Sequence, residues 1–392
     1  MKHIAIGQAG GPTAVINATL SGFVRALYKD HSLTFVCNGY EGLANKKFFH
    51  ADKEIIENLL AHEKVPGAFL GAGRYVFDDK QIYHSVHNLR ERGVDTLVFI
   101  GGNGTMEALQ RIKEEAYRQS YPLQVLGLPK TVDNDLGGTD HAPGFGSAAR
   151  YVAQATRDIG RDLQAMCNFE QVRILETMGR NSGWLAAASG LLKEDKQDGP
   201  HFIALPEKRL NPEWLLQSIE VALQDHGFAL IVVSEGVVWE QGSQVEKDKV
   251  QGRSVLGGVS KEIEGMIKKN MDVMVRSELL GMNQRSFSGA VSAVDFEEAV
   301  KVGETGALWV TQGETDIMVS LQRSQHAAYE ITYEPLLLKT IVQNGERSLP
   351  QPFLDDQSAY NEWLRPLVGF DLQTYPPPLK RGETTHVQSE SK

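Results

Sequence analysis

The sequence has little of what builds disulfide-rich, zinc-binding or nucleic-acid-binding proteins. Its 392 residues include only two cysteines, Cys37 and Cys167, which excludes a disulfide scaffold and fits a reducing compartment. No CxxC or CxxH spacing occurs, so no zinc site is indicated. Basic residues are the minority, with 40 Lys and Arg against 50 Asp and Glu, and the net charge of -10 argues against a nucleic-acid partner.

Long apolar runs are absent as well. No stretch approaches the length that crosses a membrane, and residues 1–7 turn polar too soon for a signal peptide. We therefore expect a cytoplasmic protein with no membrane partner. With 41% hydrophobic and 23% charged residues, the composition is that of an ordinary globular protein of two domains or one large α/β unit.

Short apolar runs alternate with helical patterns along the chain. The runs that predict buried strands lie at residues 4–7, 33–36, 95–100, 123–128, 172–176, 202–205 and 229–233. Between the first two runs, apolar residues recur at helical spacing at Ile16, Leu20, Phe23 and Leu27. This rhythm predicts an α/β fold with parallel sheets that are covered by helices on both faces.

Two glycine-rich turns lie between a predicted strand and a predicted helix, one at 7–13 and one at 101–105. Glycines let backbone amides approach a phosphate, and the helix that follows offers its positive N-terminus. Both turns are expected at the carboxyl edge of one sheet, where open α/β proteins bind ligands. Neither is a Walker loop, and each alone is equally consistent with a tight turn that needs positive φ.

The segment that leaves the strand ending near Leu128 carries two carboxylates, Asp133 and Asp135. Because they are two residues apart in an extended segment, both face the same side. One can accept the proton of an attacking hydroxyl, and the other can hold a magnesium ion directly or through water. Lys130 and Thr131 can meet phosphate oxygens. The alternative is an Asx-rich turn without a chemical role.

Several arginines are candidates for binding an anion. Arg180, at a strand-to-helix junction, can clamp a phosphate through two hydrogen bonds. Arg74, Arg276 and Arg285 are further candidates, although surface ion pairing is the commoner use of arginine. Ser182 is interpreted as the cap of the helix that follows it.

Together these pieces resemble the phosphofructokinase family. The matching stretches come in the family's order over roughly residues 4–310 and include Gly10-Gly11, 70–74, 101–105, PKTVDND at 129–135, MGR at 178–180, SEG at 234–236 and QR at 284–285. The resemblance implies transfer of a phosphoryl group from ATP to the 1-hydroxyl of fructose 6-phosphate, with Mg²⁺ as cofactor. It leaves open pyrophosphate as the donor, and sedoheptulose 7-phosphate or sulfofructose as the acceptor.

The resemblance also implies roles for individual positions. Asp133 resembles the general base, and the residues that resemble its catalytic partners are Asp135, Thr131, Arg180 and Arg74. The expected donor-binding residues are Gly10, Gly11, Gly102, Asn103, Gly104, Thr105 and Lys130. The expected substrate-binding residues are Met178, Gly179, Glu235, Arg276, Arg285 and Arg173. Asn103 and Asp135 are expected to hold the metal.

The architecture that the resemblance implies is two Rossmann-like, doubly wound α/β domains with the active site in the cleft between them. We expect the donor domain at 1–144 plus about 286–335 and the acceptor domain at 145–285. A C-terminal extension at 336–392 would end in a mobile tail from about 380. A homodimer or homotetramer is expected.

The chain departs from the family pattern at several positions. Asn103 stands where many members have a magnesium-binding Asp. Lys130 resembles the pyrophosphate-dependent members, but those usually have Asp at the position of Gly104, where glycine leaves room for the α-phosphate of ATP. In the acceptor pocket, Gln171 and Met282 replace an arginine and a histidine, and Arg173 would face the same side of its strand as Gln171.

Two other classes of protein stay open. A non-catalytic ligand-binding relative is one, although four retained residues argue against it, namely Asp133, Asp135, Arg74 and Arg180. A Rossmann oxidoreductase is the other, and it is disfavoured because the first strand is not followed by a clean GxGxxG.

Overall fold

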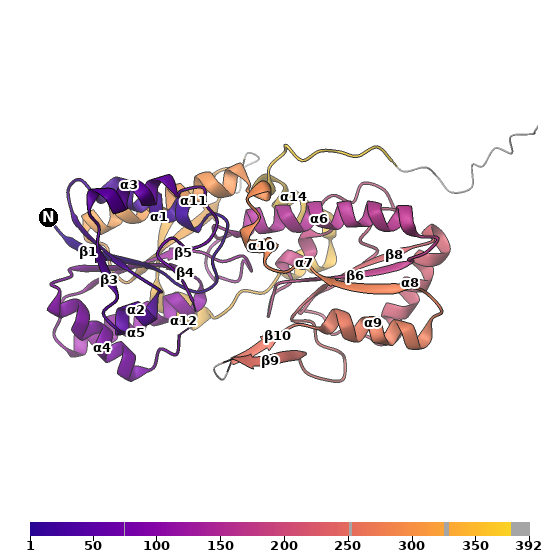
Figure 1. The fold of residues 1–392 in the computed structure, drawn as a ribbon, viewed down its shortest axis with the longest axis horizontal. Coiled ribbons are helices and arrows are strands. Elements are labelled where there is room, and N and C mark those ends of the chain that lie inside the picture. The colour runs from indigo at the N-terminus through magenta and orange to yellow at the C-terminus, as the bar shows by residue number, and fades with distance from the viewer. Residues whose placement is uncertain (74, 251–252, 325–328, 378–392) are drawn as a thin grey trace, which may run out of the picture.

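The computed structural model describes residues 1–73, 75–250, 253–324 and 329–377. Two lobes lie side by side along the long axis, each built around its own β-sheet (Figure 1). The predicted two-domain α/β fold is confirmed. The expected tail from about 380 and Arg74 both lie outside the described residues. In the ranges that are described, no helix combines the length and the apolar content needed to span a membrane.

The first lobe contains a seven-stranded sheet in the order β13-β12-β5-β4-β1-β2-β3. Its strands are β1 His3–Gln8, β2 Ser32–Val36, β3 Phe48–His50, β4 Thr96–Gly101, β5 Gln124–Pro129, β12 Ile317–Arg323 and β13 Ile331–Leu337. The five strands from β12 to β2 are parallel, whereas β3 and β13 pair antiparallel at the two edges. Antiparallel edge strands on a parallel sheet are a common variation of the doubly wound fold.

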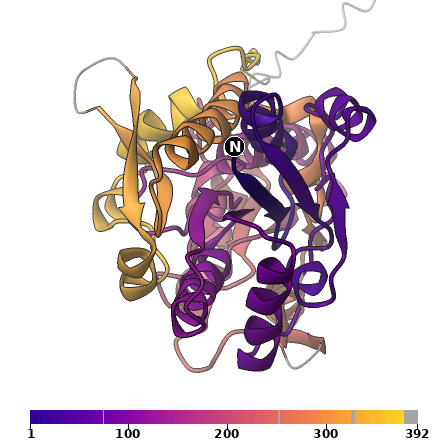
Figure 2. The same ribbon diagram turned by 90° about the vertical axis from the view of Figure 1, so that its left-hand side faces the viewer.

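Helices cover both faces of this sheet, as Figure 2 shows along the end of the lobe. One layer consists of α1 Ile16–Leu27, α3 Lys53–Ala61 and α11 Ala293–Gln312. The other consists of α2 Tyr40–Ala44, α4 Asp79–Glu91, α5 Asn103–Arg118 and α12 Leu338–Asn344. Helices α1 and α11 touch through glycines: a Cβ on Gly22 would lie 2.3 Å from the main-chain oxygen of Val300. Only glycine permits this approach.

The second lobe contains a four-stranded parallel sheet in the order β11-β6-β8-β7. Its strands are β6 Val172–Thr177, β7 Phe202–Ala204, β8 Ala229–Ser234 and β11 Val275–Leu279. The helices of this lobe are α6 Phe145–Met166, α7 Trp184–Ala188, α8 Pro212–His226, α9 Val259–Asn270 and the short α10 Asn283–Ser286. A hairpin of β9 Glu246–Val250 and β10 Arg253–Leu256 extends from it toward the first lobe (Figure 1).

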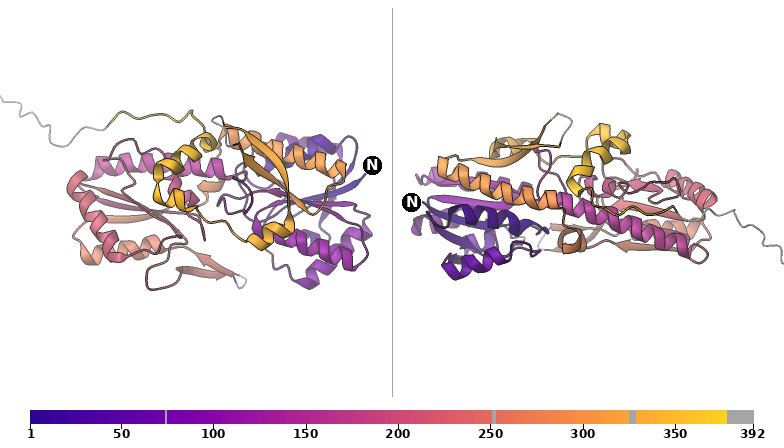
Figure 3. Two further views of the ribbon diagram at one scale, coloured as in Figure 1. Left: turned by 180° about the vertical axis from the view of Figure 1, so that it is seen from behind. Right: turned by 90° about the horizontal axis from the view of Figure 1, so that it is seen from above.

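The C-terminal segment crosses from the first lobe to the second, which is visible from behind in Figure 3. After α12 it forms α13 Gln351–Asp355 and α14 Gln357–Val368. Tyr360, Leu364 and Leu367 are fully buried in the core that α6 and α7 share. The segment is therefore part of the second lobe's core. We propose the domain limits predicted above, with the returning segment extended to the end of α12.

Candidate active site

The loops that follow β1, β4 and β5 meet at the carboxyl edge of the seven-stranded sheet. Strand β1 lies between β2 and β4, so the chain turns in opposite directions after β1 and after β4. Such a switch point is where open α/β sheets bind ligands. The loop after β4 leads at once into α5, so Gly102, Asn103, Gly104 and Thr105 form the N-terminus of that helix. The macrodipole and free amides there favour an anion.

Two cations lie against the first glycine turn. The Nζ of Lys130 donates a 2.6 Å hydrogen bond to the main-chain oxygen of Gly11. A Cβ added to Gly11 would lie 2.8 Å from Nη1 of Arg285, so this arginine packs directly on the turn. Burial lowers the pKa of Lys130 to about 8, and Arg285 contributes in the same direction. Bringing an anionic phosphate here would stabilise the charged form of Lys130.

The loop after β5 orients the two carboxylates through Thr131. The Thr131 hydroxyl donates to Oδ1 of Asp135 at 3.1 Å and accepts from the main-chain N–H of Asp133 at 3.0 Å. Burial, together with the negative charges of Asp135, Glu235 and Glu346, raises the pKa of Asp133 to about 7, although Lys130 acts in the opposite direction. Burial and Glu346 also raise the pKa of Asp135. A carboxylate with a pKa near neutrality is suited to act as a general base.

The second lobe contributes the loop after β6. Gly179 has a φ of +125°, and a Cβ there would lie 2.5 Å from the main-chain oxygen of Ser182, so glycine is required. Met178 N–H donates to the side-chain oxygen of Gln284 at 3.0 Å. The interpretation of Ser182 as a helix cap is wrong. Helix α7 is preceded by Gly183 without a side-chain cap, and the Ser182 hydroxyl donates instead to the main-chain oxygen of Asp133 at 3.1 Å.

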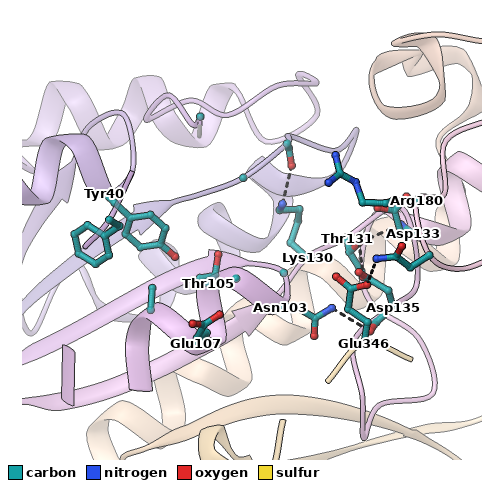
Figure 4. Close-up of a pocket in the computed structure, with 18 of the residues that line it drawn as sticks. Tyr40, Asn103, Thr105, Glu107, Lys130, Thr131, Asp133, Asp135, Arg180 and Glu346 are labelled. Carbon is teal, nitrogen blue, oxygen red and sulfur yellow. Dashed lines mark hydrogen bonds between the residues drawn. The ribbon is translucent and has the colours of Figure 1, made fainter. Parts of the chain in front are cut away.

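These loops enclose a cavity of about 430 Å³ between the lobes, and Figure 4 shows its central side chains. The predicted residues that line it are Gly10, Gly11, Gly102, Asn103, Gly104, Thr105, Lys130, Thr131, Asp133, Asp135 and Arg180. Four other predicted residues lie next to the cavity without lining it. Met178 and Gly179 precede Arg180 in its loop, and Arg285 packs on Gly11. Glu235 is close enough to Asp133 for its negative charge to raise the pKa of Asp133.

Arg173 and Arg276 lie elsewhere. Each is the second residue of its strand, β6 and β11, so both are near the amino end, whereas the cavity is at the carboxyl end of β6. At about 3.3 Å per residue, Arg173 is about 13 Å along the strand from Thr177. Glu170, Asp162 and Glu278 surround the guanidinium of Arg173, and Glu170 also pairs with Arg276 at 3.3 Å. Their contact with the acceptor stays a prediction.

Sequence reasoning missed several residues of the cavity. The cavity is also lined by aromatic side chains, among them Tyr40 and Phe77, whose rings stack with centroids 4.8 Å apart. Tyr75 and Arg111 line the cavity as well. Glu346 enters from the C-terminal segment, close to Asp135 (Figure 4). Aromatic residues near a glycine turn could have signalled the first group, but no motif points to Glu346.

The residues expected to hold magnesium fit that ion in part. The amide nitrogen of Asn103 donates to the main-chain oxygen of Asp135 at 3.0 Å, which brings both side chains to one side of the cavity. Within the described ranges, no three His, Cys, Asp or Glu side chains form a metal site by themselves. Mg²⁺ is commonly bound by one or two carboxylates together with substrate phosphates and water. A cation would also relieve the repulsion that raises the pKa of Asp133 and Asp135.

Comparisons with known proteins agree with this geometry. The sequence model described as Phosphofructokinase matches residues 3–308 of the chain. The chain belongs to the phosphofructokinase family. The sulfofructose kinase of Alkalicoccus urumqiensis is 46% identical over 93% of this chain and 95% of that protein.

The pyrophosphate–fructose 6-phosphate 1-phosphotransferase of Rhodospirillum rubrum is 33% identical over 93% of this chain and 94% of that protein. Among solved structures, the pyrophosphate-dependent phosphofructokinase of Marinobacter aquaeolei superposes with a TM-score of 0.83. It is 28% identical and covers 97% of this chain and 94% of that one. Family membership confirms the predicted enzyme class, a phosphotransferase, and excludes the alternative of a Rossmann oxidoreductase.

Proposed function

We propose that this phosphofructokinase-family enzyme transfers a phosphoryl group from ATP to the 1-hydroxyl of sulfofructose, an anionic ketose with a sulfonate on its far end. The observation that carries the proposal is that Gln171 and Met282 stand at two positions where the family pattern has an arginine and a histidine for the acceptor. The similarity to a relative named sulfofructose kinase supports it. Fructose 6-phosphate is the second candidate acceptor, and the relatives named for that substrate favour it.

The transfer uses groups that lie around the cavity. The 1-hydroxyl oxygen attacks the terminal phosphorus of the donor while Asp133 accepts the hydroxyl proton. The bond from that phosphorus to the bridging oxygen breaks, and the bridging oxygen leaves with the rest of the donor as ADP. Arg180, Lys130 and Thr131, which line the cavity, are placed to bind and orient the phosphates. Asp135 and Asn103 would hold magnesium, which would supply neutralisation of phosphate charge.

The donor side has room for a nucleotide. An added Cβ at Gly104 would meet no atom within 4 Å, so the space beside this turn is open. From there the cavity continues toward Tyr40, Tyr75 and Phe77. Aromatic side chains beyond a phosphate turn suit a nucleobase, which pyrophosphate lacks. Both features support ATP as the donor, with pyrophosphate as the alternative that Lys130 favours.

Three of the described positions that the family resemblance assigns to the far end of the acceptor bring little available positive charge, and two of them, Gln171 and Arg173, lie away from the cavity of this chain. Both ends of the Gln171 amide are engaged in hydrogen bonds to the main chain: it donates to the Cys167 oxygen at 3.1 Å and accepts from Met274 N–H at 2.9 Å. Three carboxylates neutralise Arg173, and Met282 brings no charge. A sulfonate carries one negative charge where a phosphate ester carries about two. The smaller cationic complement therefore suits the sulfonate.

The predicted homo-oligomer and cytoplasmic location are also proposals. Support for self-association comes from large apolar side chains that are exposed around α6, the edge strand β11 and α10: Met166, Phe169, Met274, Leu279, Met282 and Phe287. An exposed apolar patch on an edge strand is typical of an interaction surface.

A matrix of donors against acceptors tests the proposal. The purified protein is assayed with ATP or pyrophosphate, each against sulfofructose, fructose 6-phosphate and sedoheptulose 7-phosphate, with Mg²⁺ present. We expect the highest kcat/KM for ATP with sulfofructose, by at least tenfold over fructose 6-phosphate, which corresponds to about 1.4 kcal/mol. A higher kcat/KM for fructose 6-phosphate than for sulfofructose would refute the acceptor assignment. Turnover with pyrophosphate but not with ATP would refute the donor assignment.

A further inference from the structure

The C-terminal segment reaches the catalytic loop at one point. Helix α12 ends at Asn344, and Gly345, with a φ of +67°, turns the chain toward the loop after β5. Glu346 then pairs with Leu136 in an isolated antiparallel bridge. The N–H of Arg347 donates to the main-chain oxygen of Asp135 at 2.7 Å. The segment thus holds the backbone of the loop that carries both catalytic carboxylates.

The side chain of Glu346 bonds to the other lobe. Its Oε2 accepts a 2.5 Å hydrogen bond from the Nδ2 of Asn181, the residue that follows Arg180 in the loop after β6. Gln244 also holds this loop, since its Nε2 donates to the Arg180 main-chain oxygen at 2.8 Å and to Oδ1 of Asn181 at 3.2 Å. Glu346 therefore joins a loop of the first lobe to a loop of the second, at the cavity itself.

The residues around Glu346 anchor it on both sides of the cleft. Arg347 donates to the main-chain oxygen of Asp140 at 2.7 Å, and its guanidinium lies 4.4 Å from the ring centre of Trp184. Further along, Leu349 N–H donates to Oε1 of Glu207 at 2.8 Å, and Gly183 N–H donates to the same oxygen at 2.9 Å. Because the backbone is fixed at both ends, Glu346 can act as a tether.

We propose that Glu346 is a positioning residue of the active site: its carboxylate holds Asn181, and with it the loop of Arg180, against the loop of Asp133 and Asp135. In-line transfer needs the base from one lobe and the arginine from the other in fixed register. A misplacement of about 1 Å at such a site costs about 100-fold in rate. The proposal rests on the proposed phosphotransferase function but not on the identity of the acceptor.

A double-mutant cycle on Glu346→Ala and Asn181→Ala tests the tether, assayed with the donor and acceptor that the wild type turns over fastest. We expect each single variant to lose about tenfold in kcat, or about 1.4 kcal/mol, with KM changed less than threefold. The double variant should be no slower than the slower single variant, because both changes break one interaction. Single losses that multiply to about 100-fold, or a Glu346→Ala variant within twofold of wild type, would refute the tether.

The conservative variant separates positioning from a general loss of structure. Glu346→Gln keeps an oxygen that accepts from Asn181, so kcat should stay within about threefold of wild type, whereas Glu346→Ala loses about tenfold. A Glu346→Gln variant that is as slow as Glu346→Ala would refute the role of this hydrogen bond.

Hydrogen–deuterium exchange measures how firmly the loop at 178–183 is held, without an activity assay. Amides of residues 178–183 should exchange faster in Glu346→Ala and Asn181→Ala than in wild type. Glu304→Ala is the matched control, since Glu304 is an exposed glutamate on α11 that pairs with Lys301 at 3.1 Å. Equal exchange in all variants would refute the tether even if the proposed substrates proved wrong. A wild type that prefers another pair of substrates would refute only the proposed function.

Discussion

Gly104→Asp should shift the donor preference of this enzyme from ATP toward pyrophosphate. Gly104 is the second residue of α5, and a Cβ there would meet no atom within 4 Å. The substitution therefore causes no clash. An aspartate in the first turn of a helix stabilises it by about 0.3–1 kcal/mol, so the variant should fold at least as well as wild type.

The substitution should lower kcat/KM with ATP as the donor. The new carboxylate would enter the open space beside the turn, where the α-phosphate of ATP is expected. Two unit charges at about 4 Å interact with about 4 kcal/mol at an effective dielectric constant of about 20. That repulsion corresponds to about 1,000-fold in kcat/KM for ATP. Pyrophosphate has no α-phosphate and no nucleoside, so its turnover should change much less.

The assay is the ratio of kcat/KM for ATP to kcat/KM for pyrophosphate, with one acceptor and with Mg²⁺ in excess of the donor. Gly104→Asn is the matched control, because it has nearly the same shape without the charge, and Gly104→Ala tests the Cβ alone. We expect the ratio to fall by two to three orders of magnitude in the Asp variant only. A ratio unchanged in Gly104→Asp, or lowered equally in Gly104→Ala, would refute the assignment of this space to the nucleotide.

Three further outcomes are expected. Asp133→Asn should lower kcat by about 10²–10⁴-fold under saturating substrates, because it removes the general base, and near-wild-type turnover would exclude that role. Asp133→Asn should also raise the thermal unfolding midpoint at pH 8. The pKa of Asp133 in the folded protein, about 7, exceeds its ordinary value of 3.8, so ionisation of Asp133 destabilises the fold progressively as pH rises from 3.8 to 7. His141 lies between Asp140 at 2.9 Å and Glu298 at 2.6 Å, and the pKa of His141 is raised from 6.5 to about 9 despite the opposing effect of burial. Its stabilising contribution is full below pH 6.5 and is lost as pH rises through 9, so unfolding curves of wild type should show a decline over this range that His141→Gln lacks.

The strands and the local chemistry of the loops could be read from the sequence because both depend on neighbouring residues. Buried parallel strands such as β4 and β8 are short apolar runs, and their observed bounds differ from the predicted runs by a residue. The loop of Asp133 follows its strand directly, so its place at the sheet edge was implied by the chain itself. The antiparallel edge strands were not predicted, since β13 mixes exposed and half-buried residues without an apolar run.

Only the tertiary structure decided what each charged group faces. The sequence placed Arg173 on the same side of a strand as Gln171, but three carboxylates from different segments surround its guanidinium. Ser182 has the sequence position of a cap, yet its hydroxyl reaches the main chain of Asp133 in the other lobe. Glu346 has no motif around it and enters the cavity because the segment after α12 crosses between the lobes. Local pattern determines which residues form a strand, a turn or a loop, whereas contacts between distant segments depend on how the two lobes pack.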